Sequence, residues 1–400
     1  MYSESKTNEW IIYYNRVKDV LQGVLFHVIL ILQKLARGYS NALKSFSSMI
    51  YPSFLIFMKY NKLFTFENLY NSHLKARLSK RDKQEVIDFE LDSGANISKL
   101  FYELKYFKYN ISPYNTFYIY EPKERRVDAL RYRDRIVQHC LCDYYLTPLY
   151  DKRLIYDNAA TRIGKGTDFA RKRLKYFYYD FYNKNHNNQG YVLKCDIHHF
   201  FECIDHNVLK GILSQDIKDK DILNLLYKII DSYSFDINKG LPIGNQTSQI
   251  FAIRYLDKLD RIIKEKFRIK YYIRYMDDFI LVHESKDYLK KILEYITNLL
   301  KDEFKLELNK KTRIYKLSES VEFLGFSYRL LNNQKVLMRL NGVRRKRFLK
   351  KMKEKVYQYK NKTIDRKKLN ETFNSYLEHA SKGNCNSFRC RIKYLKKNKR

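Results

Sequence analysis

Two apolar, strand-like runs flank a pair of adjacent aspartates in the segment Tyr271 to Val282 (YYIRYMDDFILV). The apolar residues on both sides predict two β-strands, and Met276-Asp277-Asp278 between them predicts a turn. Two ionised carboxylates beside apolar strands cost Coulomb repulsion and desolvation, for which divalent cations compensate. An ordinary Asp-rich turn is the alternative, and the flanking apolar residues make it the weaker interpretation.

A third carboxylate stands in another short apolar run, Tyr191 to Ile197 (YVLKCDI). Asp196 lies near the end of this predicted strand, just before a helix expected to open near Asp205. If the two strands are neighbours, Asp196 and Asp277 can bridge a metal pair that activates a hydroxyl group for phosphoryl transfer. Such chemistry needs carboxylates, metal ions and cationic clamps, but no nucleophilic Ser or Cys.

The charge balance points to a polyanionic partner. Lys and Arg total 78 against 44 Asp and Glu, which gives a net charge of +34, and the pI is about 9.7. This excess is larger than solubility requires. A chain rich in Lys, Asn, Ile and Tyr also reflects AT-biased coding, so basicity alone favours nucleic acid only modestly and the motifs decide.

Cysteine usage and hydropathy favour a cytoplasmic location. Six cysteines scattered over 400 residues do not form a disulfide framework, so reduced thiols are expected. The most apolar run, Val20 to Leu32, contains Gln22 and His27 and is too short to cross a bilayer comfortably. We expect it to form a packed helix rather than a membrane anchor.

Four regions follow one another along the chain. Residues 1–62 are expected to be helical, 63–190 are mixed and basic, and 191–335 alternate between strands and helices. The third region should contain helices from about Ser248 to Phe267 and near Tyr288 to Lys301, which predicts a helix-backed antiparallel sheet of the split βαβ kind. Residues 336–400 form densely basic helices, which can lie along a phosphate backbone.

These motifs resemble the palm motifs of reverse transcriptases. The resemblance rests on Tyr-Met-Asp-Asp at 275–278, Asp-Ile-x-x-Phe-Phe at 196–201 and Val-Glu-Phe-Leu-Gly-Phe at 321–326, in the family's order, and it covers roughly residues 65 to 390. It implies an α+β right-hand polymerase. By that resemblance, 63–190 are the fingers, 191–335 a ferredoxin-like antiparallel palm and 336–400 a helical thumb, preceded by an N-terminal helical extension.

The resemblance also implies the roles of individual palm residues. Asp196, Asp277 and Asp278 correspond to the catalytic acids, and together with Ile197 they form the expected metal-binding set for two Mg²⁺ ions, with Mn²⁺ as an alternative. Phe201 corresponds to the aromatic steric gate that excludes a 2′-hydroxyl, so dNTPs are the expected substrates. A core phenylalanine is the alternative for Phe201, and the preferred interpretation for Phe200.

Two loops correspond to nucleotide-binding segments of the family. Lys123 and Arg125 resemble fingers residues that hold the incoming triphosphate, with Arg126 as an alternate and a solvated charge run as the competing interpretation. The segment 240–249 (GLPIGNQTSQ) corresponds to the nucleotide and template loop, where Ile243 and Gly244 are the expected dNTP contacts. Asn245, Thr247 or Ser248 can cap the following helix.

The remaining expected partners are nucleic acids and, through the resemblance alone, a small basic accessory protein. Template RNA and a DNA or RNA primer should contact basic residues of the thumb. The predicted nucleic-acid-binding residues are Arg344, Arg345, Lys346, Arg347, Lys350 and Lys351.

Within the family, the Ile-Gly-Asn-x-Thr-Ser-Gln form of the loop looks like reverse transcriptases of diversity-generating retroelements. Those enzymes make error-prone cDNA, and Ile243 offers no hydrogen bond where many relatives have Gln, so lower fidelity is expected. The loop Arg162 to Thr167 (RIGKGT) and Ser375 to His379 (SYLEH) give the same, weaker indication. The alternatives are another bacterial or phage reverse transcriptase, of abortive-infection or group II-like type, and a non-catalytic nucleic-acid-binding scaffold.

Overall fold

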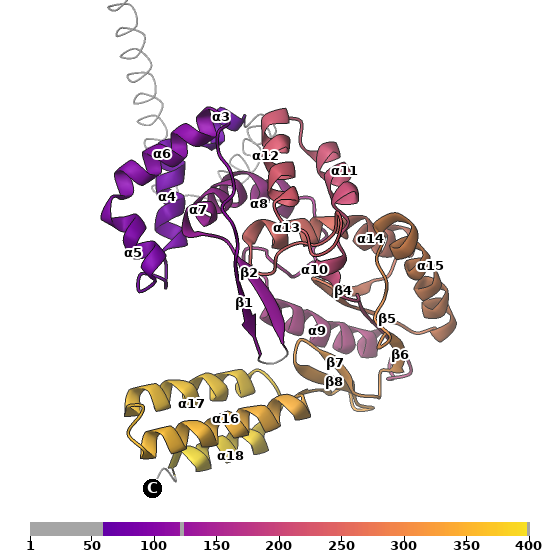
Figure 1. The fold of residues 1–400 in the computed structure, drawn as a ribbon. Helices are drawn as coiled ribbons and strands as arrows, with labels where there is room; N and C mark the ends of the chain where they lie inside the picture. Colours follow the sequence, from indigo (N-terminus) through magenta and orange to yellow (C-terminus); the bar gives the residue numbers. More distant parts are fainter. Residues whose placement is uncertain (1–58, 121–123, 398–400) are drawn as a thin grey trace, which may run out of the picture. The chain divides into compact units, whose positions relative to one another are not determined.

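The computed structural model describes residues 59–120 and 124–397 (Figure 1). The expected N-terminal helical extension lies outside these residues apart from its last four positions, as does the apolar run at 20–32. Lys123 also lies outside them. In the described part of the chain, no helix is long and apolar enough to span a membrane.

Residues 59–151 form a helical group from which one hairpin extends. Its helices are α3 (Tyr60–Leu63), α4 (Phe66–Ala76), α5 (Gln84–Leu91), α6 (Ser93–Lys105), α7 (Tyr132–Leu141), the π-helical segment η2 (Cys142–Leu146) and α8 (Thr147–Asp151). The antiparallel strands β1 (Asn115–Ile119) and β2 (Arg125–Ala129) form the hairpin. Side-chain caps define two helix starts, because Thr65 accepts from the Asn68 amide and Asp92 from the Ala95 amide.

A four-stranded antiparallel sheet follows, in the order β4-β5-β3-β6. Its strands are β3 (Tyr191–Asp196), β4 (Tyr271–Tyr275), β5 (Asp278–His283) and β6 (Arg313–Lys316). Residues 279–282 of β5 are all buried, so both faces of this strand are covered. Helix α9 (Thr167–Asn185) packs against β4, and α15 (Lys286–Phe304) packs against β3, β5 and β6. This arrangement confirms the predicted α+β class with a helix-backed antiparallel sheet.

The helices inserted between β3 and β4 differ in detail from the prediction. They are α10 (Phe200–Cys203), α11 (His206–Asp216), α12 (Lys220–Asp231), α13 (Gln246–Tyr255), α14 (Asp257–Arg261) and the π-helical segment η3 (Ile262–Lys266). The single helix expected from about Ser248 to Phe267 is thus divided into three, beginning two residues earlier. Of the three candidate caps, Asn245 is the N-cap residue of α13, but its side chain makes no capping hydrogen bond.

A second, three-stranded sheet joins this region to the C-terminal helices. Strands β7 (Val321–Phe323), β8 (Phe326–Leu330) and β9 (Val336–Leu340) pair antiparallel in that order. Helices α16 (Gly342–Lys360), α17 (Arg366–Ser381) and α18 (Asn386–Lys397) follow. One hydrophobic cluster runs from α9 through both sheets into these helices, so β9 belongs to the same packed unit as β8 although it begins after residue 335.

Candidate active site

The three aspartates predicted to be catalytic come together at one end of the four-stranded sheet. Asp196 ends β3 and Asp278 begins β5, and the two are direct partners in the antiparallel register. Asp277 lies in the turn between β4 and β5, adjacent to Asp278. The condition set for a shared metal pair, that the two strands are neighbours, is therefore met.

The turn itself requires an unusual backbone conformation at Met276. This residue has φ 57°, in the left-handed region that non-glycine residues rarely adopt. Its carbonyl oxygen accepts a hydrogen bond from Nη1 of Arg274 at 3.0 Å. Arg274 in turn donates to both carboxylate oxygens of Asp260. The conformation of the turn is thus held by a charged side chain two residues earlier.

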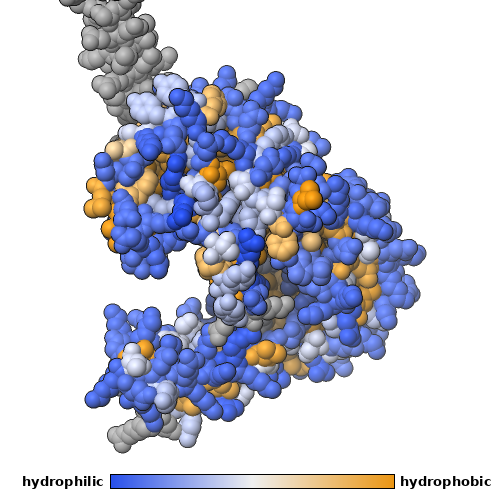
Figure 2. Space-filling view, in the orientation of Figure 1, coloured by the Kyte–Doolittle hydropathy of each residue, from blue (hydrophilic) through white to orange (hydrophobic). Residues whose placement is uncertain are grey.

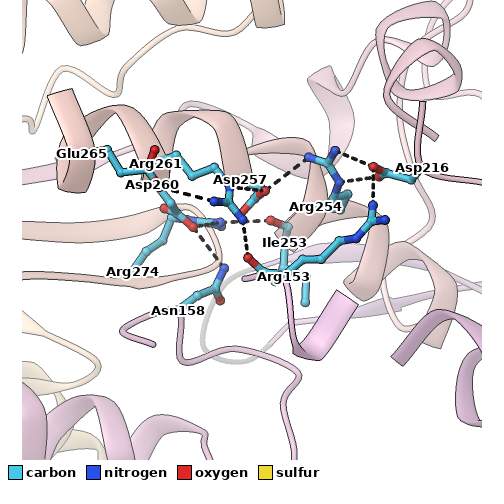
Figure 3. Close-up of polar contacts among 10 residues, drawn as sticks. All are labelled: Arg153, Asn158, Asp216, Ile253, Arg254, Asp257, Asp260, Arg261, Glu265 and Arg274. Atoms are coloured by element: carbon cyan, nitrogen blue, oxygen red, sulfur yellow. Dashed lines mark hydrogen bonds and ion pairs between the residues drawn. The ribbon is translucent and has the colours of Figure 1, made fainter. Parts of the chain in front are cut away.

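Arg274 and Asp260 belong to a larger polar network behind the turn (Figure 3). Arg274 also donates to the carbonyl of Ile253 at 3.0 Å, and Asp260 accepts from Nδ2 of Asn158 at 3.2 Å. Both members of the central ion pair have fully buried side chains. The network continues outwards through Arg254 of α13 and Asp257 and Arg261 of α14, and then through Asp216 at the end of α11 and Arg153 after α8.

Asn158 also connects the turn to the segment before α9. The backbone amide of Arg274 donates to the carbonyl of Asp157, and the carbonyl of Arg274 accepts from the amide of Ala159. Sequence reasoning missed Asn158, Asp260 and Arg274 as members of this site. The available signal was an arginine inside the apolar run 271–275, because a charge there requires a buried partner.

Electrostatics around the three carboxylates favour a bound cation. Burial, the largest cause, raises the pKa of Asp277 to about 6; the Asp196 carboxylate acts in the same direction and the Arg125 guanidinium opposes it. Burial also raises the pKa of Asp278 to about 7, against the effect of Lys194, whose Nζ is 3.9 Å from Oδ1 of Asp278. Ionising both groups at neutral pH therefore requires compensating positive charge.

The donor set matches the chemistry of Mg²⁺. Carboxylate oxygens are its preferred protein ligands, and Oδ1 of Asp278 is buried without a hydrogen-bond partner in the described residues. Ile197 follows Asp196 directly and bridges to Leu308. In the described part of the chain, no three His, Cys, Asp or Glu side chains already form a metal-holding cluster.

The predicted gate and nucleotide loop are connected through the backbone. Phe201 is partly exposed in α10, whereas Phe200 is 3 % exposed and belongs to the core. The amide of Leu241 donates to the carbonyl of Phe201 at 2.7 Å. Gly244 has φ 107°, and a Cβ there would lie 3.9 Å from Cγ1 of Val127 on β2. The loop therefore passes beside the β1–β2 hairpin, where the triphosphate contacts are expected.

The structure distinguishes between the two arginines considered for triphosphate binding. Arg126 donates from Nε to Oδ1 of buried Asp128 at 3.1 Å, and this hydrogen bond raises the pKa of Arg126. Arg125 is exposed and forms no ion pair with the described residues. Its charge lowers the pKa of Asp277, so Arg125 is the better placed of the two.

The glycine-punctuated loop after Asn158 is held mainly by its own arginine. Arg162 donates to the Asp151 carboxylate at 2.6 Å and to the Ile155 carbonyl at 2.7 Å. Lys165 lies 4.4 Å from the centre of the Tyr156 ring. Burial lowers the pKa of Lys165 to about 8. Arg162 is thus occupied within the protein, and Lys165 also donates to the Tyr156 carbonyl.

The basic residues of α16 do not share one environment. Arg345, Lys346 and Lys350 are exposed, whereas Arg347 and Lys351 are partly buried. Arg344 is also partly buried: its guanidinium covers Gly325, where a Cβ would lie 1.8 Å from Nη1. Burial lowers the pKa of Arg344. Hydrophilic residues dominate the face in Figure 2, including the region of α16 and α17.

Comparison with known families agrees with this geometry. Residues 124–328, just over half of the 400 residues, match the family described as reverse transcriptase (RNA-dependent DNA polymerase). The chain belongs to the reverse transcriptase family. The match includes the three aspartates, Phe201 and the Gly240–Gln249 loop, and it ends within β8.

A curated relative of this reverse transcriptase is a putative COX1/OXI3 intron 2 protein of Saccharomyces cerevisiae. It is 26 % identical over 204 residues, covering 35 % of this chain and 24 % of that protein. The chain thus spans about a quarter of the length of that relative.

Solved structures of telomerases are distant neighbours of this reverse transcriptase. Apo telomerase from Candida tropicalis, truncated from its C-terminal domain, has a TM-score of 0.43 at 17 % identity, over 62 % of this chain and 60 % of that one. Telomerase from Candida albicans with a telomeric RNA fragment gives 0.44 at 12 % identity, over 60 % and 48 %. A likeness of this degree carries no inference about activity.

Proposed function

We propose that this chain is an RNA-directed DNA polymerase that adds dNTPs to a primer by phosphoryl transfer assisted by two Mg²⁺ ions. The observation that carries the proposal is the convergence of Asp196, Asp277 and Asp278 at adjacent strand ends. Two of these carboxyl groups have raised pKa values. They are therefore poised to exchange protons for metal ions at neutral pH.

The protein's own groups have separate tasks in this proposal. The three aspartates, with Ile197 beside them, would hold the ions, which neutralise developing charge and activate the primer hydroxyl. Arg125, together with Lys123, binds the triphosphate, while Phe201 excludes a 2′-hydroxyl. Arg274 binds no substrate in this scheme but holds the turn that carries Asp277.

Template and primer contacts belong to the same proposal. The exposed cations of α16 supply sequence-independent contacts to phosphates, so binding should weaken steeply with added salt. The family match, described as RNA-dependent DNA polymerase, supports a nucleic-acid template as the partner class. A small basic accessory protein is proposed on the sequence resemblance alone.

For the subtype, we propose error-prone cDNA synthesis of the diversity-generating kind. Its support is Ile243, an apolar and partly exposed residue in the nucleotide loop. An intron-type reverse transcriptase is the second candidate, favoured by the yeast relative. Sequencing the products of wild type and Ile243→Gln separates the two: errors concentrated opposite adenine that Ile243→Gln reduces support the first, whereas a uniform spectrum unaffected by the substitution supports the second.

The deciding experiment is primer extension on an RNA template with Mg²⁺. Asp277→Asn and Asp196→Asn should each abolish extension while retaining binding of the primer–template in fluorescence anisotropy. Asp302→Asn, an exposed aspartate at the end of α15, is the matched control and should extend normally. Equal extension by all three variants, or none by wild type under any metal or template, would reject the catalytic assignment and favour a nucleic-acid-binding scaffold.

A further inference from the structure

Two adjoining hollows lie where α9, β9 and the loop between α17 and α18 meet. Their volumes are about 370 Å³ and 480 Å³, and both are lined by Lys335 and Asn384. The first is also lined by Leu337, Arg339, Arg345, Cys385, Asn386, Ser387 and Phe388. The second is also lined by Lys172, Lys175, Tyr176, Tyr179, Gln334 and Val336. We call the joined hollows the α9–β9 trough.

The lining of the trough is positively charged and uncompensated. It contains five cationic side chains and no Asp or Glu. None of the five forms an ion pair with an acidic side chain of residues 59–120 or 124–397. Many other cations of this chain are paired, such as Arg171 with Asp168 at 2.7 Å on the same helix. The trough therefore concentrates positive charge that is available to an anionic ligand.

Exposed aromatic rings accompany these charges in a regular pattern. Lys172, Lys175, Tyr176 and Tyr179 follow the i, i+3, i+4, i+7 spacing of one helix face, and all four are exposed. The Arg173 guanidinium lies 5.3 Å from the centre of the Tyr176 ring and is held by the Asp157 carboxylate at 2.7 Å. This contact restrains Tyr176 while leaving the side chain 49 % exposed.

Hydrogen bonds fix the other walls of the trough. The amide of Asn384 donates to the Met338 carbonyl at 2.6 Å, and Oδ1 of Asn384 accepts from the Met338 amide at 2.9 Å. Gly383 permits this approach, because a Cβ there would lie 2.6 Å from the same carbonyl oxygen. At the other end, Gln334 donates to Asn183 on α9. The trough is therefore a built surface rather than a gap between loose segments.

We propose that the α9–β9 trough binds a single-stranded polynucleotide. Its cations, Lys175, Lys335 and Arg339 foremost, contact successive phosphates, and bases stack on Tyr176 and Tyr179. Flat rings with adjacent positive charge are the combination that single strands use, since every base has a face that can stack. Only Arg345 is shared with the residues assigned above to the polymerase. The trough thus provides a second attachment for a template or product strand.

Binding to the full chain tests this proposal without requiring catalysis. The protein is first loaded with a primer–template hairpin, and labelled twelve-nucleotide oligouridine or oligothymidine is then titrated at several NaCl concentrations. Binding should weaken about tenfold or more in the triple variant Lys175→Ala/Lys335→Ala/Arg339→Ala. The slope of log K against log salt should fall by about 2 in the same variant, since single strands contribute about 0.7 per phosphate contact. Tyr176→Leu/Tyr179→Leu should weaken it about fivefold or more.

The control is a charge-matched variant on α15, Lys286→Ala/Lys291→Ala/Lys301→Ala. Its affinity for the oligonucleotides should differ from that of wild type by less than about twofold. Equal binding of oligouridine and oligothymidine supports recognition through phosphate and base alone, and tighter binding of oligouridine supports it with a 2′-hydroxyl contact added. Equal losses of affinity in the trough triple variant and in the α15 triple variant would overturn the proposal. Polyglutamate that competes as effectively as the oligonucleotides would also overturn it. Because extension is not measured, these outcomes are independent of whether the polymerase proposal holds.

Discussion

Arg274 and Asp260 form an ion pair 2.6 Å apart, with both side chains fully buried. The same guanidinium reaches the Met276 carbonyl, so the pair joins α14 to the turn that carries Asp277. A buried charge pair often adds little net stability, yet removing one partner leaves an uncompensated charge. Its hydrogen bond to the Met276 carbonyl, beside a backbone with positive φ, indicates a role in shaping the turn.

Arg274→Lys should therefore lower the extension rate more than it lowers stability. Lysine keeps a positive charge for Asp260 but lacks the planar fork that reaches Met276 and Ile253 together. We expect extension to fall about tenfold or more, by analogy with other losses of precise positioning. Arg274→Met, which leaves Asp260 buried and unpaired, should cost about 3–5 kcal/mol of unfolding free energy, measured by urea denaturation.

Two comparisons separate positioning from stability. Arg274→Met/Asp260→Leu removes both charges and should recover much of the stability lost in Arg274→Met without restoring extension. Arg261→Ala removes a half-exposed guanidinium from buried Asp257 but leaves Arg254 3.5 Å from that carboxylate, so it should cost less than about 1 kcal/mol and leave extension unchanged. A double variant that regains both stability and extension would show that Arg274 acts only as a structural charge.

The raised pKa values of Asp277 and Asp278 make stability depend on pH and on metal. The folded chain keeps these protons up to about pH 6 and 7, whereas unfolded aspartates release theirs near about pH 4. Below about pH 4 the neutral carboxyl groups therefore contribute fully to the free energy of unfolding. This contribution is lost as the pH rises through 6 and 7. Mg²⁺ should raise the thermal midpoint by on the order of 2 °C at pH 8, and less at pH 5.5 where protons compete.

Asp278→Asn is the informative variant for this effect. It removes one repelling charge, so the metal-free midpoint at pH 8 should rise above that of wild type while the response to Mg²⁺ shrinks. Asp302→Asn should change neither quantity. A response to Mg²⁺ that is as large at pH 5.5 as at pH 8, or that survives in Asp278→Asn, would place the bound ion elsewhere.

Sequence patterns predicted the strands and the turn of this site better than they predicted the side-chain contacts that hold the turn. The apolar runs around Asp196 and Asp277 predicted strands because alternation and turn residues are local properties. The pairing of Asp260 with Arg274 depends on how α14 packs beneath β4, which no short-range pattern encodes. Asn158 illustrates the same limit: nothing in its local sequence marks it, yet its side chain is fully buried against Asp260.

Two glycines with opposite surroundings should respond oppositely to alanine. A Cβ at Gly383 would lie 2.6 Å from the Met338 carbonyl oxygen and 3.0 Å from the Phe326 ring, so Gly383→Ala should cost about 1–3 kcal/mol. A Cβ at Gly211, inside α11, meets nothing within 4 Å. Gly211→Ala should therefore gain about 0.5–1 kcal/mol. Urea denaturation compares the two, and a neutral Gly383→Ala would show that β9 and the following loop can separate.

Phe201→Val should relax discrimination against ribonucleotides. The side chain is partly exposed, while its backbone carbonyl is held by the Leu241 amide at 2.7 Å. Replacing the ring therefore frees space without altering the chain path. We expect the preference for dNTPs over rNTPs, measured as a ratio of kcat/KM in single-nucleotide extension, to fall about tenfold or more. Phe235→Val, a half-exposed phenylalanine beside Gly240, should change that ratio by less than about twofold. An unchanged ratio in Phe201→Val would reject the gate while leaving the three aspartates as the catalytic proposal.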